Sequence, residues 1–166
     1  MHRNHSKKPI GKYALRGIID DSKERNVPAS IILVVDDEPI ITKTLVLILN
    51  NLKDEFFAIG STSISEALKI VEGIRPDLVL LDVIMPGARG LEQAVRMRDT
   101  LGCKVLMMSG QGATANLLED SVREGNQPFE ILAKPIHPND LVARIRENLN
   151  SPLVSDWKNP LNFHVQ

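Results

Sequence analysis

Short apolar runs alternate along the chain with segments in which apolar residues recur at helical spacing. The most apolar run, residues 78–81, leads into Asp82 and is followed closely by Pro86 and Gly87. A wholly apolar run of this length between turn formers indicates a strand buried on both faces, as in a parallel sheet. Five strands are predicted: Ile31–Val35, Glu55–Ile59, the run that ends at Asp82, Lys104–Met108 and Phe129–Ala133.

Helices are predicted between and after these strands. Pro39 suits the first turn of the first helix, and Ser63 with Glu66 forms a capping box for the second, which Gly73 ends. The predicted helices cover residues 40–52, 64–72, 90–100, 113–123 and 137–148. Side chains expected to face the sheet are Leu91, Ala94, Val95, Met97, Leu141, Ile145 and Leu149. Because strand and helix alternate five times, the sequence predicts a doubly wound α/β domain with right-handed crossovers.

Composition supports one globular domain with two extensions. Of the 166 residues, 43% are hydrophobic, which suffices for the core of one domain. Residues 1–30 carry seven Lys or Arg against three Asp or Glu, whereas residues 31–150 carry twelve against seventeen. We therefore expect a basic, flexible extension over 1–30 with at most a short helix near 12–23, a domain over 31–150 and a short tail over 151–166.

Cysteine usage and hydropathy point to the cytoplasm. The single cysteine, Cys103, excludes an intramolecular disulfide and fits a reducing compartment, where it would serve as a small core residue. No apolar stretch approaches the roughly 18 residues of a membrane span, and the N-terminus has no apolar region of the signal type. The sequence therefore predicts a cytoplasmic protein.

Polar residues follow the strands at the points where they end. Asp36 and Asp37, here called the acidic pair, follow the first strand, Asp82 ends the third, Ser109 follows the fourth and Lys134 the fifth. The carboxyl ends of parallel strands meet at one edge of the sheet, where open α/β sheets bind ligands, so we expect these side chains to lie together. Acids alone would indicate a hard cation such as Mg2+. The added hydroxyl and ammonium indicate a site for a phosphoryl group.

The chemistry of these groups predicts a role for each. Asp82 would be the nucleophile and form an acyl phosphate. The acidic pair would hold the metal, which screens the charge of the incoming phosphoryl group. Ser109 would donate a hydrogen bond to one phosphoryl oxygen, with Gly110 leaving room beside it, and Lys134 would pair with another oxygen.

The order and spacing of these motifs resemble the receiver domains of two-component response regulators, in the stand-alone, single-domain form. The resemblance covers about residues 31–150 and rests on the acidic pair, Asp82 in Leu-Leu-Asp-Val-Ile-Met-Pro-Gly, Ser109-Gly110 and Lys134-Pro135. It implies a flavodoxin-like fold with a five-stranded parallel sheet in the order 2-1-3-4-5. It also implies phosphotransfer from a histidine kinase to Asp82, Mg2+ bound additionally by the carbonyl of Ile84, and a cis bond before Pro135.

Two positions depart from the usual pattern of this family. Ile84 stands where the family usually has a polar residue two after the acceptor, and it would shield the acyl phosphate from water unless Gln111 orients one. Ile131 replaces the usual Tyr or Phe three residues before the lysine and cannot act as an aromatic switch. We expect the loop Ser109–Asn116 to carry the conformational change instead. The alternative is that the domain switches little.

The same motifs allow three rival interpretations. Residues 110–115 match the dinucleotide fingerprint G-x-G-x-x-G/A, but they follow the fourth strand, and no acid ends the next strand to hold a ribose. A phosphatase of the haloacid dehalogenase type needs an acid two residues after the nucleophile, where this chain has Ile84. A phosphate-independent adaptor with the same fold remains the alternative function.

The partners expected from the sequence are a histidine kinase or phosphotransfer protein and an unknown downstream protein. No DNA-binding, kinase or cyclase segment is recognised after the domain, and residues 151–166 are too few for an output domain. We therefore expect output through a protein contact or onward phosphotransfer. The protein is not expected to be an enzyme beyond its own phosphorylation and dephosphorylation.

Overall fold

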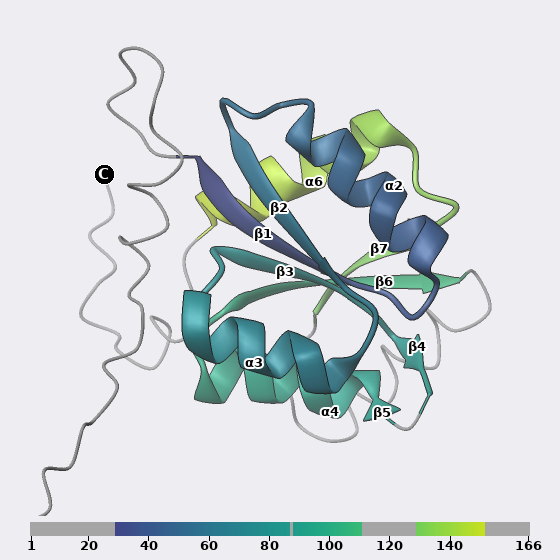
Figure 1. Cartoon of the computed structure of the whole chain (residues 1–166), viewed down its shortest axis with the longest axis vertical. Coiled ribbons are helices and arrows are strands. Elements are labelled where there is room, and N and C mark those ends of the chain that lie inside the picture. The colour runs from purple at the N-terminus through teal and green to yellow at the C-terminus, as the bar shows by residue number, and fades with distance from the viewer. Residues whose placement is uncertain (1–28, 87, 111–128, 152–166) are drawn as a thin grey trace, which may run out of the picture.

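The computed structural model describes residues 29–86, 88–110 and 129–151. Within these ranges, five parallel strands form one sheet in the order β2-β1-β3-β6-β7 (Figure 1). This order confirms the predicted doubly wound sheet with its 2-1-3-4-5 arrangement. The strands are β1 (Ser30–Val35), β2 (Phe56–Ser61), β3 (Leu78–Asp82), β6 (Lys104–Gly110) and β7 (Glu130–Lys134).

Helices cover both faces of the sheet, with α2 and α6 on one side and α3 and α4 on the other (Figure 1). Their bounds are α2 (Pro39–Asn50), α3 (Ile64–Ile74), α4 (Gly90–Val95), the π-helix η1 (Arg96–Thr100) and α6 (Pro138–Asn150). One hydrophobic cluster lies between the sheet and α2 and α6, and a second lies between the sheet and α3, α4 and η1. All seven side chains predicted to face the sheet are buried or partly buried in these clusters.

Helix α3 begins at Ile64 as predicted, but its capping box is only half formed and its end differs. The Ser63 hydroxyl accepts the Glu66 N–H at 3.3 Å, as a capping box requires. The Glu66 carboxylate, however, accepts from the Ser61 hydroxyl at 2.9 Å, so the reciprocal half of the predicted box is not formed. The helix continues past Gly73 and is capped by Arg75 at φ 55°. The prediction that Gly73 ends this helix was wrong, because a glycine inside a helix costs only about 1 kcal/mol.

The segment after Asp82 contains a short hairpin that the sequence did not predict. Strands β4 (Ile84–Met85) and β5 (Ala88–Arg89) pair antiparallel before α4 begins. A Cβ on Gly90 would lie 2.3 Å from the carbonyl oxygen of Val83, so only glycine lets α4 start this close to the end of β3. The helix predicted over residues 90–100 has the correct extent, but its last five residues form the π-helix η1.

Some predicted elements lie outside the described residues. They are the helix over residues 113–123, the short helix near 12–23, and the extension and tail over 1–30 and 151–166, apart from the few residues at their inner ends. Among the helices that the structure describes, none is long and apolar enough to cross a membrane.

Candidate functional site

Lys134 joins two aspartates at the carboxyl edge of the sheet. Its Nζ lies 2.7 Å from Oδ2 of Asp36 and 2.6 Å from Oδ2 of Asp82. Asp36 follows β1, Asp82 ends β3 and Lys134 ends β7, with β6 between the last two strands. The long lysine side chain therefore reaches across a neighbouring strand to the two carboxylates. Three of the predicted site residues are in direct contact.

This charged group is largely removed from solvent. The side chains of Asp36 and Asp82 are 0% and 8% exposed, and that of Lys134 is 19% exposed. Burial by itself would lower the pKa of Lys134, but hydrogen bonds to Asp36 and Asp82, together with their negative charges, raise it above its ordinary value. Lys134 is therefore held as an ammonium, ready to pair with a further anionic group.

The second oxygen of each aspartate is also held. Oδ1 of Asp36 accepts the N–H of Glu38 at 3.0 Å, and Oδ1 of Asp82 accepts the N–H of Ile84 at 3.1 Å. Each bond closes a turn from an aspartate to the N–H two residues later, which is a conformation that Asp favours. Both carboxylates are therefore fixed from two sides, by a backbone N–H and by the lysine.

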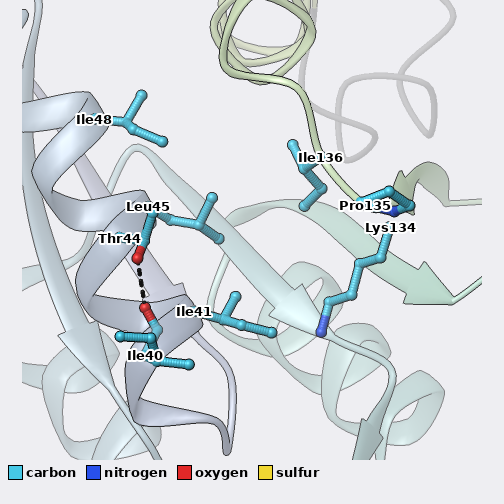
Figure 2. Close-up of a pocket in the computed structure, with 8 residues that line it drawn as sticks. All are labelled: Ile40, Ile41, Thr44, Leu45, Ile48, Lys134, Pro135 and Ile136. Atoms are coloured by element: carbon cyan, nitrogen blue, oxygen red, sulfur yellow. Dashed lines mark hydrogen bonds between the residues drawn. The ribbon is translucent and has the colours of Figure 1, made fainter.

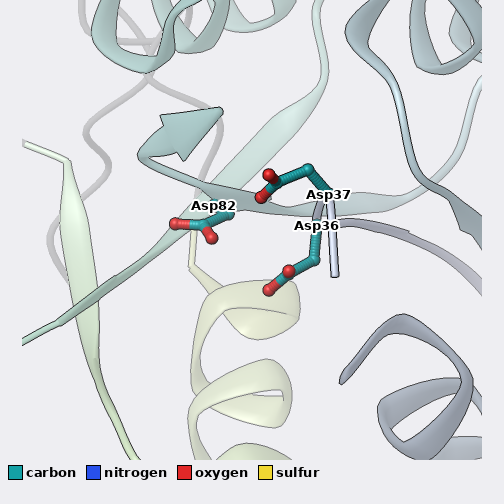
Figure 3. A group of neighbouring side chains, drawn as sticks. All are labelled: Asp36, Asp37 and Asp82. Carbon is teal, nitrogen blue, oxygen red and sulfur yellow. The ribbon is translucent and has the colours of Figure 1, made fainter. Parts of the chain in front are cut away.

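Asp36, Asp37 and Asp82 together form a candidate metal site (Figure 3). One carboxylate oxygen from each lies within 4.8 Å of the others. Three oxygen donors, two of them buried, suit a hard cation such as Mg2+. The donor set thus fits the ion predicted from the sequence, while the Ile84 carbonyl as a further ligand stays a prediction.

Ser109 lies at the same edge but is turned to another partner. It is fully buried at the end of β6, and its hydroxyl donates to the carbonyl oxygen of Gly110 at 3.0 Å. Donation to a phosphoryl group on Asp82 would require the hydroxyl to give up this hydrogen bond. Gln111 and most of the loop Ser109–Asn116, to which we assigned the conformational change, lie outside the described residues.

The two unusual isoleucines occupy different environments. Ile84, two residues after Asp82, is 65% exposed, so its side chain lies at the surface near that carboxylate. Ile131 packs partly buried against the cluster on the α3 and α4 side, level with Met107 of β6. Phe129 is buried in the same cluster, with the Arg98 guanidinium 4.2 Å from its ring centre. Phe129 lies just before the first residue of β7, whereas Ser109 is level with Ala133 near the other end of that strand.

The peptide bond between Lys134 and Pro135 is cis. This confirms the geometry expected from the family resemblance.

Comparison with known proteins identifies the family. A model of the response regulator receiver domain matches residues 32–146. The chain belongs to that family. It is 34% identical over 118 residues to the DNA-binding response regulator MtrA of Mycolicibacterium smegmatis, a match covering 71% of this chain and 50% of MtrA. It is 30% identical over 133 residues to the phosphate regulon transcriptional regulatory protein PhoB of Pseudomonas aeruginosa, covering 78% and 56%.

Solved structures agree with this assignment. The crystal structure of a putative response regulator from Chloroflexus aurantiacus superposes with a TM-score of 0.63 at 28% identity, covering 74% of this chain and 99% of that chain. Phosphorylation and Mg2+ bound at an acidic pocket are features of receiver domains. The matched residues lie within the predicted domain 31–150, while the extension and the tail stay predictions.

One expectation about partners needs correction. The sequence was interpreted as that of a regulator without a DNA-binding domain, yet MtrA is a DNA-binding response regulator and PhoB a transcriptional regulatory protein. The chain spans about half the length of the curated relatives it matches. The end of this sequence therefore carries no information about output, and the inference from the short tail was wrong.

Sequence reasoning missed an apolar groove beside the receiver site (Figure 2). The groove has a volume of about 450 Å3 and lies between α2 and the segment that follows β7. Its charged lining residue is Lys134, and its apolar lining residues are Ile40, Ile41, Leu45, Ile48, Pro135 and Ile136. Ile40, which lines the groove, is 70% exposed. The signal available in the sequence was the helical spacing of Ile41, Leu45 and Ile48, which places them on one side of α2.

Proposed function

We propose that this receiver domain accepts a phosphoryl group on Asp82 from the phosphohistidine of a histidine kinase, with Mg2+, and so acts in a phosphorelay. The observation that carries the proposal is the bridge from Lys134 to Asp36 and Asp82, beside three clustered carboxylates. Burying such charges costs several kcal/mol per ion before pairing repays it, so the cluster is poorly explained by stability alone. A phosphoryl group needs these groups together.

In the proposed transfer, a carboxylate oxygen of Asp82 attacks the phosphorus of the phosphohistidine. The P–O bond forms as the P–N bond breaks, and the leaving imidazole keeps the bonding electrons and takes up a proton. Mg2+ held by the acidic pair and Asp82 would screen the negative charge of the phosphoryl group. Lys134 pairs with one phosphoryl oxygen, and the Ser109 hydroxyl turns from Gly110 to donate to another.

A labelling experiment tests this function. The protein is incubated with Mg2+ and either a labelled histidine kinase or labelled acetyl phosphate, and incorporation is measured by intact mass and autoradiography. Wild type should gain one phosphoryl group, a chelator should abolish the gain, and Asp82→Asn should remain unlabelled. Equal labelling of Asp82→Asn would refute the acceptor assignment. A wild type that stays unlabelled by both donors would favour the phosphate-independent adaptor.

The apolar groove beside Lys134 supplies a docking face for the protein donor in this proposal. A phosphohistidine carried on a helix has to approach Asp82 from the open carboxyl edge, and Lys134 belongs both to that edge and to the groove. The exposed Ile40 side chain would contact the donor helix. Ile40→Asp should therefore slow transfer from the kinase while leaving transfer from acetyl phosphate unchanged. An equal effect on both donors would contradict docking at this groove.

The output of the phosphorylated domain has three candidates: a protein contact, onward phosphotransfer, and control of a DNA-binding segment, as the descriptions of MtrA and PhoB suggest. Onward phosphotransfer is the simplest of the three outputs to distinguish by experiment. Labelled receiver domain mixed with a histidine-containing phosphotransfer protein should lose its label to that protein if this is the route. A label that decays only to inorganic phosphate would favour one of the other two outputs.

A further inference from the structure

Thr42 makes a hydrogen bond that is unusual for a threonine inside a helix. Its hydroxyl donates to the carbonyl oxygen of Asp36 at 2.8 Å, six residues earlier and outside α2. Threonine hydroxyls in helices ordinarily bond the carbonyl four residues earlier, as Thr44 does on Ile40 at 2.7 Å. Thr44 is exposed, whereas Thr42 is only 5% exposed. The two threonines of one helix thus differ in partner and in burial.

The carbonyl that Thr42 binds belongs to the peptide group joining Asp36 to Asp37. On the other side of Asp36, its N–H donates to the carbonyl oxygen of Ser61 at 3.2 Å. A peptide group is planar, so fixing its carbonyl also fixes the direction of the Asp37 N–H and restricts the dihedral angles of both aspartates. The orientation of the acidic pair therefore depends on a side chain that touches neither carboxylate.

Packing fixes the rotamer of Thr42. A Cβ placed on Gly60 of β2 would lie 2.6 Å from Cγ2 of Thr42, which means that the threonine methyl fills the space above this glycine. With its methyl against β2, the side chain keeps its hydroxyl directed at the Asp36 carbonyl. Gly60 and Thr42 thus act together on the peptide group between the two acids.

We propose that Thr42 is a positioning residue for the metal site: its buried hydroxyl holds the Asp36–Asp37 peptide so that both carboxylates face the cluster with Asp82. The inference rests on the proposed binding of Mg2+ by these acids. Groups that orient metal ligands from outside the coordination sphere typically contribute 10- to 100-fold in metal affinity. We expect Thr42 to lie at the lower end of that range.

Calorimetric titration with Mg2+ of the whole chain tests this role. Thr42→Val keeps the shape but removes the hydroxyl, and its dissociation constant for Mg2+ should rise about tenfold. Thr42→Ser keeps the hydroxyl and should bind within about twofold of wild type. Thr44→Val makes the same change at the exposed threonine and should leave the affinity unchanged.

A substitution in β2 should disturb the same Asp36–Asp37 peptide group through Thr42. Gly60→Ala should displace the Thr42 methyl, rotate the hydroxyl away and weaken Mg2+ binding about as much as Thr42→Val. If Thr42→Val does not fold, Thr42→Ala replaces it as the variant without the hydroxyl. Wild-type affinity in Thr42→Val or Thr42→Ala, or a tenfold loss in Thr42→Ser, would overturn the positioning role. Failure of wild type to bind Mg2+ would instead reject the proposed metal site itself.

Discussion

The carboxyl edge of the sheet buries its charges, whereas the amino edge pairs them at the surface. At the carboxyl edge, the Asp36 and Asp82 side chains that Lys134 joins are less than a tenth exposed. At the amino edge, Glu55 before β2 pairs with Arg146 of α6, and both side chains are more than two-fifths exposed. The two edges belong to the same strands, so the fold does not require either arrangement by itself.

The amino edge ties α6 to the sheet. Lys104, the first residue of β6, donates from Nζ to the carbonyl oxygens of Asn148, Leu149 and Ser151. A positive charge at the carbonyl end of a helix is favourable because of the helix dipole. Exposed ion pairs contribute less than about 1 kcal/mol, and a buried charge left unpaired costs several. The comparison indicates that one edge secures the structure, while the other holds the groups of the proposed phosphotransfer.

The largest difference between the two edges should come from substitutions at the two ends of β3. Asp82→Asn removes the proposed acceptor and should abolish labelling by acetyl phosphate. Asp77→Ala, at the amino end, removes the carboxylate that accepts the N–H of Ile31 at 2.8 Å. It should lower the melting temperature and leave labelling intact. Loss of labelling in a folded Asp77→Ala protein would contradict the inference that the amino edge affects stability but not phosphorylation.

Lys134→Met should be the most destabilising change at the carboxyl edge. It leaves Asp36 and Asp82 without their ammonium, which costs about 3 kcal/mol in the absence of Mg2+. Added Mg2+ should stabilise this variant more than wild type, because the ion supplies the missing positive charge. Urea unfolding with and without Mg2+ measures both effects. If Lys134→Met were as stable as wild type without Mg2+, Lys134 would not be needed to neutralise the buried carboxylates.

The same variant has a predictable pH dependence. The pKa of Lys134 is raised in the folded protein, so its contribution is complete below the pKa of an unfolded lysine, about 10.4, and is lost as pH rises through the higher folded value. The stability gap between wild type and Lys134→Met should therefore be constant from neutral pH up to about 10 and close as the solution becomes strongly alkaline.

Lys104→Met tests the amino edge with a lysine of similar reach. Three helix-end carbonyls lose their donor, and the free energy of unfolding should fall by about 2 kcal/mol. The rate of phosphorylation by acetyl phosphate should not change, since Lys104 is at the far end of its strand from Ser109. If Lys104→Met is phosphorylated more slowly under conditions in which it is fully folded, the two edges are coupled.

Ile84→Asn tests the exposed position two residues after the proposed acceptor, Asp82. An amide side chain can orient water toward the acyl phosphate, whereas isoleucine shields it. Dephosphorylation should become severalfold faster, within the roughly 100-fold that a positioned polar group contributes. Decay of labelled protein after removal of the donor measures the rate. An unchanged or slower rate would assign control of the water to another group, such as Gln111.

Glu55→Gln should have the smallest effect. The hydrogen bond and charge of Arg146 lower the pKa of Glu55 in the folded protein. The stabilising contribution is therefore present above the pKa of an unfolded glutamate and is lost as pH falls through the lowered value. Because the pair is exposed, the melting temperature should fall only slightly at pH 7 and match wild type in strong acid. A large change at pH 7 would contradict the contrast between the two edges.

The strands and the set of site residues were predictable, because both depend on local patterns, whereas the strand order followed only from the resemblance to receiver domains. Apolar runs mark buried strands, and a parallel sheet brings their carboxyl ends to one edge. Asp36, Asp82 and Lys134 could thus be brought together from their positions after the strands, and the structure places them in contact. The wrong end of α3 shows the limit of local rules, since a glycine inside a helix costs only about 1 kcal/mol and the helix continues past Gly73 to Ile74.

The sequence by itself determined the doubly wound sheet, its acidic edge and the resemblance to receiver domains. Only the tertiary structure decided which atoms form hydrogen bonds. The Ser109 hydroxyl donates to the Gly110 carbonyl, the Ser61 hydroxyl to the Glu66 carboxylate, and the Thr42 hydroxyl to the Asp36 carbonyl. The groove between α2 and the segment after β7 was likewise decided there. These features depend on rotamers and on distances between segments remote in sequence, which hydrophobic periodicity does not encode.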